Sequence, residues 1–498
     1  MHKRAWVAVL ALVAVLAVAA DSVGAQGGDD AWTDAYRPAL LAQFAGDMAL
    51  LPGAPRYDVA LILSVDEQAA TLIGHQSVRY TNRTPATTLD ELVFRLYPNL
   101  VSYGAEMQVG RVTVGGISVV PALDTTHSVL TVPLPAPLAP GLDMTLEMDF
   151  SVRVEAGGHA LYDQFSYLEG VLALPQAYPV LSVFEPGSGW WQVTDHPQGD
   201  ATFSETAFFT VRITAPANLI LAASGSLVDL VVNADGTLTH HYAAPLMRDF
   251  ALFASTDFVT LSGEQDGVRI NLYYNPELSN SQQAARVGLQ MTQDALRIYN
   301  TAYGQYPFIE LDVVQTLTTA GGMEYPGVFV IGRSAWDPDD VYFEFLIAHE
   351  TAHQWWYALV GNDQTLYPWL DEGLAQFSVA VYIRELEGEP SYQNALSSFR
   401  VQYQGFAAEA FDQTIGSPVT AYPDQAYFYI VYQKSPLFFA TLAEEYGYDT
   451  MLQVLQDYFF AYRYRYVTPP DLLSSFESSL GVDLDTLFAE WVGMVAVG

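Results

Sequence analysis

The most informative part of the 498-residue sequence is the run Phe343-Glu344-Phe345-Leu346-Ile347-Ala348-His349-Glu350-Thr351-Ala352-His353. The apolar residues before the first histidine favour a buried helix. On a helix, His349 and His353 lie one above the other on the same face, so both imidazoles can bind one cation. Glu350 projects about 100° around the helix from His349 and stands beside that cation without binding it. The pattern therefore predicts a metal-dependent hydrolase with Glu350 as its general base.

A third metal ligand is expected from the start of a second helix, in the run Trp369-Leu370-Asp371-Glu372-Gly373-Leu374-Ala375. Asp371 can cap this helix, and eighteen residues separate His353 from Glu372. Two neutral imidazoles and one carboxylate suit a single Zn²⁺ and leave a fourth position for water. A structural zinc site would be closed, usually by cysteines, and the chain has none. Glu372 could instead be a helix-end surface carboxylate, and Glu385 and Asp363 are less favoured alternatives for the third ligand.

Two patterns of hydrophobicity divide the chain. Short runs with period two lie between Gly, Pro, Asn and Asp turns, at residues 57–63, 91–96, 144–150 and 208–213. They predict an all-β, sandwich-like domain over residues 52–265, preceded by an arm at 26–51 that is laid on its surface. Residues 266–498 are expected to form an α+β, mostly helical catalytic domain, with a helix over 281–303 and a strand over 311–317.

The composition excludes several classes of partner and chemistry. The 56 acidic and 20 basic residues give a formal charge of -36, so no nucleic-acid partner is expected, because binding to phosphates needs clustered Lys and Arg. A hydrophobic content of 51% indicates a folded globular protein. Without cysteine there is neither a disulfide framework nor a thiolate nucleophile. Only two of the basic residues are lysines, Lys3 and Lys434.

The first residues have the pattern of an export signal. Lys3 and Arg4 precede sixteen residues without a charge, and small residues follow at Ser22 to Ala25. This predicts a signal peptide over residues 1–25, cleaved near Ala25, and a secreted or periplasmic/extracellular protein. A membrane anchor is the alternative, but it needs about 20 apolar residues. No integral membrane segment is expected after signal removal.

The chain resembles the aminopeptidase N family of zinc aminopeptidases, gluzincins in which HExxH is followed after eighteen residues by Glu. The resemblance spans about residues 55 to 495. Three further segments carry it: Gly321-Gly322-Met323-Glu324-Tyr325, which looks like the GxMEN segment of the family; Tyr432-Gln433-Lys434-Ser435; and the closing stretch from Thr468 to Trp491. The resemblance implies a thermolysin-like catalytic domain that hydrolyses the N-terminal residue from peptides with a free N-terminus.

The same resemblance implies roles for individual residues. Tyr432 would stabilise the tetrahedral oxyanion, with Tyr427 and Tyr429 as rival candidates. Glu324, in the segment with Gly322 and Met323, would hold the free α-amine of the substrate. The family also places a polar residue of the β domain near that amine, and Gln176 is the candidate, although it could equally be a loop glutamine.

This sequence departs from the family pattern at three places. Tyr325 replaces the usual Asn of GxMEN, Ser435 stands where Gly is common, and the long C-terminal helical domain of larger members is expected to be absent. Two other functions remain open: a zinc endopeptidase, and a non-catalytic binding or surface module that retains the fold. Lys434, two residues after Tyr432, prompts the hypothesis that its compact ammonium positions that turn, where a guanidinium would not fit.

Overall fold

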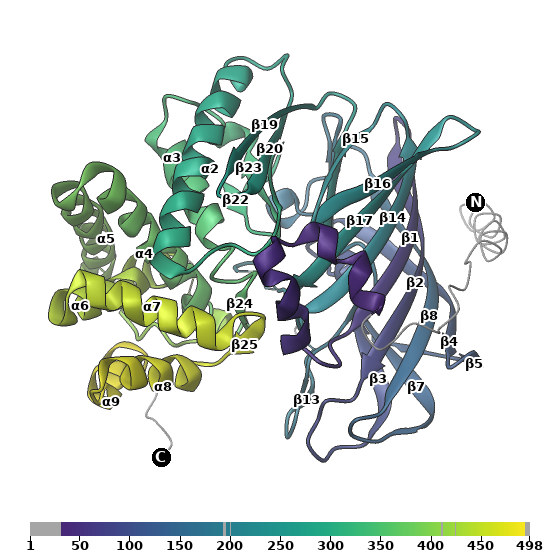
Figure 1. Ribbon diagram of the computed structural model, residues 1–498, viewed down its shortest axis with the longest axis horizontal. Helices are drawn as coiled ribbons and strands as arrows, with labels where there is room; N and C mark the ends of the chain where they lie inside the picture. The colour runs from purple at the N-terminus through teal and green to yellow at the C-terminus, as the bar shows by residue number, and fades with distance from the viewer. Residues whose placement is uncertain (1–30, 193–195, 200, 410–411, 424, 494–498) are drawn as a thin grey trace.

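The computed structural model describes residues 31–192, 196–199, 201–409, 412–423 and 425–493, and the predicted signal peptide lies outside them. Figure 1 shows strands gathered on one side of the molecule and most helices on the other. The chain is thus a sheet-rich domain followed by a mostly helical one, which confirms the expected fold class. Within the described residues, no helix has the length and apolar character needed to cross a membrane.

The first domain is built on one large sheet with the strand order β16-β17-β14-β1-β2-β8-β4-β5. All four runs with period two that were read from the sequence are strands. The strands of this sheet are β1 (Arg56–Val65), β2 (Ala69–Thr81), β4 (Ala105–Val114), β5 (Ile117–Val119), β8 (Asp143–Glu155), β14 (Ala207–Pro216), β16 (Ser226–Val232) and β17 (Thr237–Met247). Alternate residues of β1 and β2 are buried, as expected for a sheet with one face on the core.

Smaller sheets complete this domain. One has the order β15-β18-β10-β9 and another the order β11-β3-β7-β6, with a separate hairpin of β12 and β13. Their strands are β9 (Ser166–Leu168), β10 (Val171–Pro175), β15 (Ile220–Ala223), β18 (Ala251–Ser255), β3 (Leu89–Arg95), β6 (Ala122–Leu123), β7 (Val129–Leu138), β11 (Val180–Leu181), β12 (Phe184–Glu185) and β13 (Gly189–Trp190).

The second domain begins with a five-stranded sheet of order β19-β20-β21-β23-β22. Its strands are β19 (Val259–Gln265), β20 (Val268–Tyr274), β21 (Glu310–Thr316), β22 (Gly322–Met323) and β23 (Val328–Gly332). Because β19 pairs along its whole length with β20, the change from one sheet to the next falls between β18 and β19. This is earlier than residue 265, where the periodicity was expected to change.

Helices form the rest of the second domain and are seen on the left of Figure 1. The predicted helix over 281–303 is α2, and the strand expected over 311–317 is β21, one residue earlier. The helices are α2 (Ser281–Tyr303), α3 (Val341–Ala352), α4 (Trp369–Glu387), α5 (Glu389–Glu409), the π-helix η10 (Phe428–Lys434), α6 (Ser435–Tyr446), α7 (Tyr448–Tyr462), α8 (Pro469–Leu480) and α9 (Asp485–Trp491). A short parallel pair joins β24 (Val360–Asn362) to β25 (Arg465–Val467).

The arm before β1 contacts both domains. It forms the short 3-10 helices η3 (Ala31–Ala35), η4 (Arg37–Ala39) and η5 (Ala42–Leu50), which Figure 1 shows between the two halves. Trp32 packs edge-on against Phe208 of β14, with ring centroids 4.9 Å apart. Asp47 accepts hydrogen bonds from Arg463 and Tyr464 of the helical domain, each at 3.0 Å. The arm therefore lies on the β domain, as the sequence predicted, and also contacts the helical domain.

A buried arginine joins the two domains. The guanidinium of Arg248, just after β17, donates from Nε to the carbonyl of Tyr357 at 2.7 Å and also to the carbonyls of Leu359 and Arg465. A fourth bond, of 3.2 Å, reaches Ser204 in its own domain. Burial lowers the pKa of Arg248 to about 10, and the side chain stays charged at neutral pH. One cation thus satisfies carbonyl groups from both sides of the interface.

Arg248→Met is expected to lower the free energy of unfolding by about 3 kcal/mol, because several buried carbonyls lose their donor. Urea denaturation followed by fluorescence measures the change. The matched control is Arg212→Met, since Arg212 is half-exposed and forms an ion pair with the exposed Asp58. Equal effects of the two substitutions would show that the interface does not depend on Arg248.

Candidate active site

The two histidines of the HExxH motif are placed by α3. Asp340 caps this helix by accepting a hydrogen bond from the backbone N–H of Tyr342 at 2.9 Å. The helix ends at Ala352, and His353 is its C-cap residue with a helical backbone conformation, so the two imidazoles keep the expected spacing. The His353 Nδ1 lies 2.9 Å from the carbonyl of Trp356. This contact holds a proton on Nδ1 and leaves Nε2 as the free donor atom.

The third expected ligand lies on α4. Glu372 is in the first turn of that helix. Its two neighbours in the sequence, Asp371 and Gly373, are buried. The expectation that Asp371 caps the helix is wrong, because α4 begins at Trp369 and the N-cap residue is Pro368. The Asp371 carboxylate instead accepts the backbone N–H of Glu372 at 2.8 Å, inside the first turn.

The three ligand candidates converge on one point. Nε2 of His349 and Nε2 of His353 are 3.1 Å apart, and they lie 3.3 and 3.4 Å from Oε2 of Glu372. Tetrahedral zinc with bonds of about 2.0–2.2 Å needs ligand atoms about 3.3–3.5 Å apart. The distances, the burial of all three side chains and the mixed N/O donor set therefore fit Zn²⁺.

The charges around these atoms also favour a cation. Four carboxylates are buried here, those of Glu324, Glu350, Asp371 and Glu372. Burial raises the pKa of Glu324 and that of Asp371 to about 7, and the nearby Glu372 charge adds to both shifts. Burial alone would raise the pKa of Glu372, but hydrogen bonds with the two imidazoles lower it. Such an excess of buried acid is stable only with positive charge close by.

The alternative third ligands lie elsewhere. Glu385 is exposed and accepts a hydrogen bond from Tyr448 at 3.2 Å. Asp363 accepts the backbone N–H groups of Thr365 and Leu366, each at 3.0 Å. In the described part of the chain, neither joins the cluster of His349, His353 and Glu372.

The segment that resembles GxMEN lies at the edge of the five-stranded sheet. Gly322 and Met323 form β22, and the buried Glu324 follows it. The Glu324 Oε1 accepts a hydrogen bond from Gln364 Nε2 at 3.1 Å. Ligand atoms of Glu324, Glu350 and His353 all lie within 4.8 Å of one another. The edge strand thus places Glu324 beside the proposed base, on the side of His353.

Two residues of this segment have structural explanations. A Cβ at Gly322 would overlap the carboxylate of Glu350, so glycine is needed for the strand to pass this close to the base. Tyr325, which replaces the usual Asn, turns its ring toward Phe253 of the β domain, with centroids 5.6 Å apart. The Tyr325 carbonyl accepts a hydrogen bond from Gln354 at 3.2 Å, two residues after α3.

The candidate oxyanion donor lies on the π-helix η10. The Tyr432 hydroxyl donates to Oε1 of Glu372 at 2.5 Å. Of its rivals, Tyr427 lines the same cavity, whereas the Tyr429 ring stacks on Phe406 with centroids 4.5 Å apart. The geometry therefore favours Tyr432, whose hydroxyl is the one seen to reach the ligand cluster. A π-helical turn is rare and frequently occurs at functional sites.

Contacts on both sides hold this turn in place. The Gln376 amide on α4 donates to the carbonyl of Tyr432 at 2.9 Å. Ser435, where the family often has Gly, packs against Gly373, and a Cβ at 373 would lie 2.9 Å from that of Ser435. The glycine that allows this close contact is therefore Gly373 on α4, and the segment that follows Tyr432 carries Ser435.

Lys434 ties the same turn to the chain that follows α5. Its ammonium donates to Oδ1 of Asp412 and to the carbonyl of Gln413, each at 2.7 Å. Nζ also lies 5.1 Å from the ring centroid of Tyr403. A compact ammonium can make these three contacts at once, in line with the hypothesis that Lys434 positions the turn.

Gln176 follows β10 and is buried, but it does not line the cavity as the structure describes it. Its amide donates to Oδ2 of Asp249 at 2.9 Å, and the Tyr357 hydroxyl donates to the same oxygen at 2.5 Å. Its role as a contact for the substrate amine stays a prediction, since its amide nitrogen is already bonded to Asp249.

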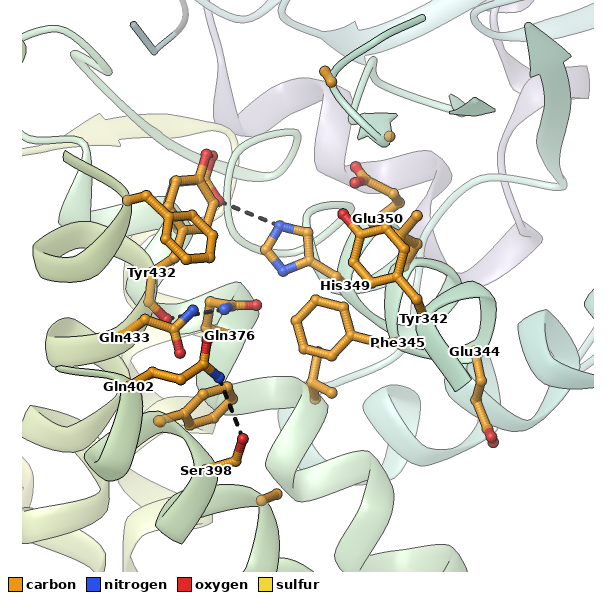
Figure 2. Close-up of a pocket in the computed structure, with 18 of the residues that line it drawn as sticks. Tyr342, Glu344, Phe345, His349, Glu350, Gln376, Ser398, Gln402, Tyr432 and Gln433 are labelled. Atoms are coloured by element: carbon orange, nitrogen blue, oxygen red, sulfur yellow. Dashed lines mark hydrogen bonds and ion pairs between the residues drawn. The ribbon is translucent and has the colours of Figure 1, made fainter. Parts of the chain in front are cut away.

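The candidate residues open into a cavity of about 880 Å³. Gly322, Met323, Glu324, His349, Glu350, Glu372 and Tyr432 all line it. Figure 2 shows Tyr342 and Phe345 of α3 facing Gln376, Gln402 and Tyr432 across this space, with His349 between them. A cavity with a metal-ligand cluster and a carboxylate on one wall suits hydrolysis of a bound substrate.

Sequence reasoning missed two supporting residues. Gln376, which holds the Tyr432 carbonyl, is one helical turn after Glu372 and could have been found from that spacing. Gln364, which holds Glu324, carries no motif or periodicity that would single it out.

Gly322→Ala is expected to reduce kcat by about 10²-fold or more, because the added methyl group displaces the Glu350 carboxylate from its position. The zinc content should stay at one per chain. Steady-state kinetics with metal analysis measures both quantities, and Gly321→Ala is not a suitable control since Gly321 has a φ of 96°. Ala320→Ser is the neighbouring control. An alanine variant with unchanged kcat would contradict the proposed close approach.

Lys434→Arg is expected to lower kcat about tenfold with little change in KM, because the π-helical turn shifts Tyr432, which acts in the transition state. A neutral Lys434→Met variant should lose as much or more. Steady-state kinetics with a free-amine substrate measures the effect. A fully active Lys434→Arg enzyme would show that the retention of this lysine is coincidental.

Comparisons with known proteins agree with this geometry. Residues 287–491 match the Peptidase family M1 domain. Human endoplasmic reticulum aminopeptidase 2 is 27% identical over 50% of this chain and 26% of its own length. Aminopeptidase M1-A of Oryza sativa subsp. japonica is 23% identical over 90% of this chain and 51% of its own length. The chain thus spans between about a quarter and a half of these curated relatives.

A solved structure supports the arrangement of domains. The M1 zinc metallopeptidase from Deinococcus radiodurans aligns with a TM-score of 0.66 at 17% identity, over 90% of this chain and 94% of that one. At this identity the likeness concerns the fold. The zinc-ligand geometry and the two-domain fold therefore agree with the match of residues 287–491 to the Peptidase family M1 domain.

Proposed function

We propose that this protein is an exported zinc aminopeptidase that hydrolyses the first peptide bond of peptides with a free N-terminus. One observation carries the proposal: a carboxylate oxygen of the buried Glu324 lies within 4.8 Å of a carboxylate oxygen of Glu350 and of a ring nitrogen of His353. A carboxylate at this position can bind a cationic group of the substrate. The α-ammonium of a peptide is such a cation, and it lies two bonds from the first carbonyl carbon.

Glu324 also explains why a blocked peptide would be a poor substrate. An acetylated N-terminus has no positive charge, so Glu324, whose Oε1 accepts a hydrogen bond from the neutral amide of Gln364, would be left buried without the substrate's cation. Desolvating a carboxylate without a cation is costly. The site therefore favours an aminopeptidase over a zinc endopeptidase, which has no free amine to hold.

The residues of the cavity divide the work of hydrolysis. Zinc bound by His349, His353 and Glu372 would act as a Lewis acid and lower the pKa of a bound water to about 7. The Glu350 carboxylate takes a proton from the attacking water and delivers it to the leaving amine, a contribution of about 10²–10⁴-fold. The Tyr432 hydroxyl, which here donates to Glu372, would donate to the developing oxyanion, a contribution of about 10²–10³-fold.

The export part of the proposal rests on the sequence alone. Its support is the charged start, the uncharged run and the small residues that end at Ala25. We propose a secreted or periplasmic/extracellular location on that basis, with peptides as the partners of the site.

Cleavage of leucinamide and of N-acetyl-leucinamide by the zinc-loaded protein tests the proposal. The free amine is expected to be cleaved at least 10²-fold faster in kcat/KM, because the acetylated form leaves Glu324 without a counter-charge. Release of ammonia measures both reactions, and removal of zinc with a chelator should abolish them.

The control is Glu350→Gln, which should retain one zinc per chain and lose about 10²–10⁴-fold in kcat. Faster cleavage of the acetylated compound would favour the endopeptidase. Full activity of Glu350→Gln would place the activity elsewhere, and a zinc-loaded protein that cleaves neither compound would favour the non-catalytic module.

A further inference from the structure

The active-site cavity continues well beyond the residues assigned to the reaction. On α4 a stripe of residues with spacings of four, three, four and three lines it: Glu372, Gln376, Val379, Ile383 and Leu386. These positions lie on one face of the helix. At 1.5 Å per residue the stripe is about 21 Å long, enough for about six extended peptide residues.

The facing helix runs the other way along the same space. On α3, Phe345 and Tyr342 precede His349 by one and two turns and also line the cavity. The Tyr382 hydroxyl of α4 donates to Oε1 of Glu344 on α3 at 3.0 Å, which pairs the late part of α4 with the early part of α3. Both stripes therefore leave the ligand cluster in the same direction.

Glu324 lies at the opposite end of this line. Along α3 the order is Phe345, His349 and His353, each one turn apart, and Glu324 groups with His353. A peptide whose ammonium meets Glu324, and whose first carbonyl lies at the ligand cluster, must direct its second residue toward Phe345. The section between α3, α4 and α5 is thus where the leaving part of the peptide lies.

The walls of this section are mostly apolar, with the uncharged polar side chains of Gln376, Ser398 and Gln402 among them. Val379, Leu346 and Phe399 are buried and contribute aliphatic and aromatic surface, and Phe428 of η10 adds a further ring. The section opens to solvent around Leu386 and Gln402, which are exposed. An apolar wall favours apolar side chains on the leaving residues, by about 0.8 kcal/mol for each buried CH₂ as a general rule.

The section also has no cation for a carboxylate. Among the described residues that line the cavity, none is lysine or arginine, while Glu344 and Glu387 are both present. A dipeptide bound at Glu324 would place its C-terminal carboxylate inside the apolar section, within about two residues of the ligand cluster. Burying that charge without a partner is unfavourable.

Resting on the proposed aminopeptidase function, we propose that the section between α3, α4 and α5 binds the leaving segment of the peptide, selects apolar second residues and rejects a buried C-terminal carboxylate. The substrates are then peptides long enough for the carboxylate to reach solvent beyond Leu386, or peptides with an amidated end. Free dipeptides are poor substrates.

The experiment compares leucyl-leucine with leucyl-leucinamide on the zinc-loaded enzyme, in 0.5 M salt so that the overall negative charge is screened. The amide is expected to have a kcat/KM at least tenfold higher. Among amidated dipeptides, leucyl-phenylalaninamide should exceed leucyl-glycinamide about tenfold. Equal kcat/KM values for leucyl-leucine and leucyl-leucinamide would overturn the proposal. Equal kcat/KM values for leucyl-phenylalaninamide and leucyl-glycinamide would overturn it as well.

Two matched variants on α5 locate the effect. Gln402→Arg puts a cation at the exposed end of the cavity. It should lower the ratio of kcat/KM for leucyl-leucinamide to kcat/KM for leucyl-leucine several-fold. Gln393→Arg makes the same change on an exposed site of α5 outside the cavity and should leave that ratio and the leucinamide rate unchanged. Equal narrowing in both variants would assign the effect to overall charge and overturn the proposal.

Leucinamide distinguishes the two levels of inference, since its leaving group is ammonia and does not enter the section. Turnover of leucinamide without discrimination between the dipeptides would contradict only the binding section. No turnover of leucinamide by zinc-loaded enzyme would contradict the proposed function and, with it, the inference that rests on it.

Discussion

The structure depends on burying more negative than positive charge at one point. Glu324, Glu350, Asp371 and Glu372 come from the end of an edge strand and from two helices, and the imidazoles of His349 and His353 lie among them. A metal ion bound by this group would offset the buried negative charge and stabilise the arrangement. The packing of α3 against α4 brings the three ligand atoms to within 3.1 to 3.4 Å of one another.

The features that the sequence predicted are those that depend on residues a few positions apart in the chain. The spacing of His349 and His353 predicts one helix face, and the structure keeps it although His353 is already the C-cap. The β strands and α2 follow from periods of two and 3.6 in the same way. Glu372 was expected as the third ligand from its place at a helix start and from the donor set that zinc prefers, but nothing local says that α4 packs against α3, so Glu385 and Asp363 stayed open as alternatives.

Failures of prediction arose where a neighbour distant in the sequence decides the outcome. Asp371 is a residue type that often caps helices, but the N-cap residue is Pro368. The Asp371 carboxylate lies inside the first turn, where it accepts the backbone N–H of Glu372. The pattern of β19 alternates like the first domain, yet its partner is β20. The polar bridge at Arg248 and the cavity wall on α5 leave no periodic signal either, because each depends on tertiary packing.

The scarcity of basic residues then acquires a physical meaning. Arg248 spans the domain interface, Arg463 holds the arm through Asp47, and Lys434 ties the tyrosine turn to Asp412. The cations at these three places therefore serve the architecture, and none lines the cavity. Among the described residues, the site has buried acid at one end and neither lysine nor arginine in its walls. Under the proposed function, these charges would draw the substrate's ammonium to Glu324 and repel a carboxylate along the exit, so the same electrostatics would orient the peptide and select its length.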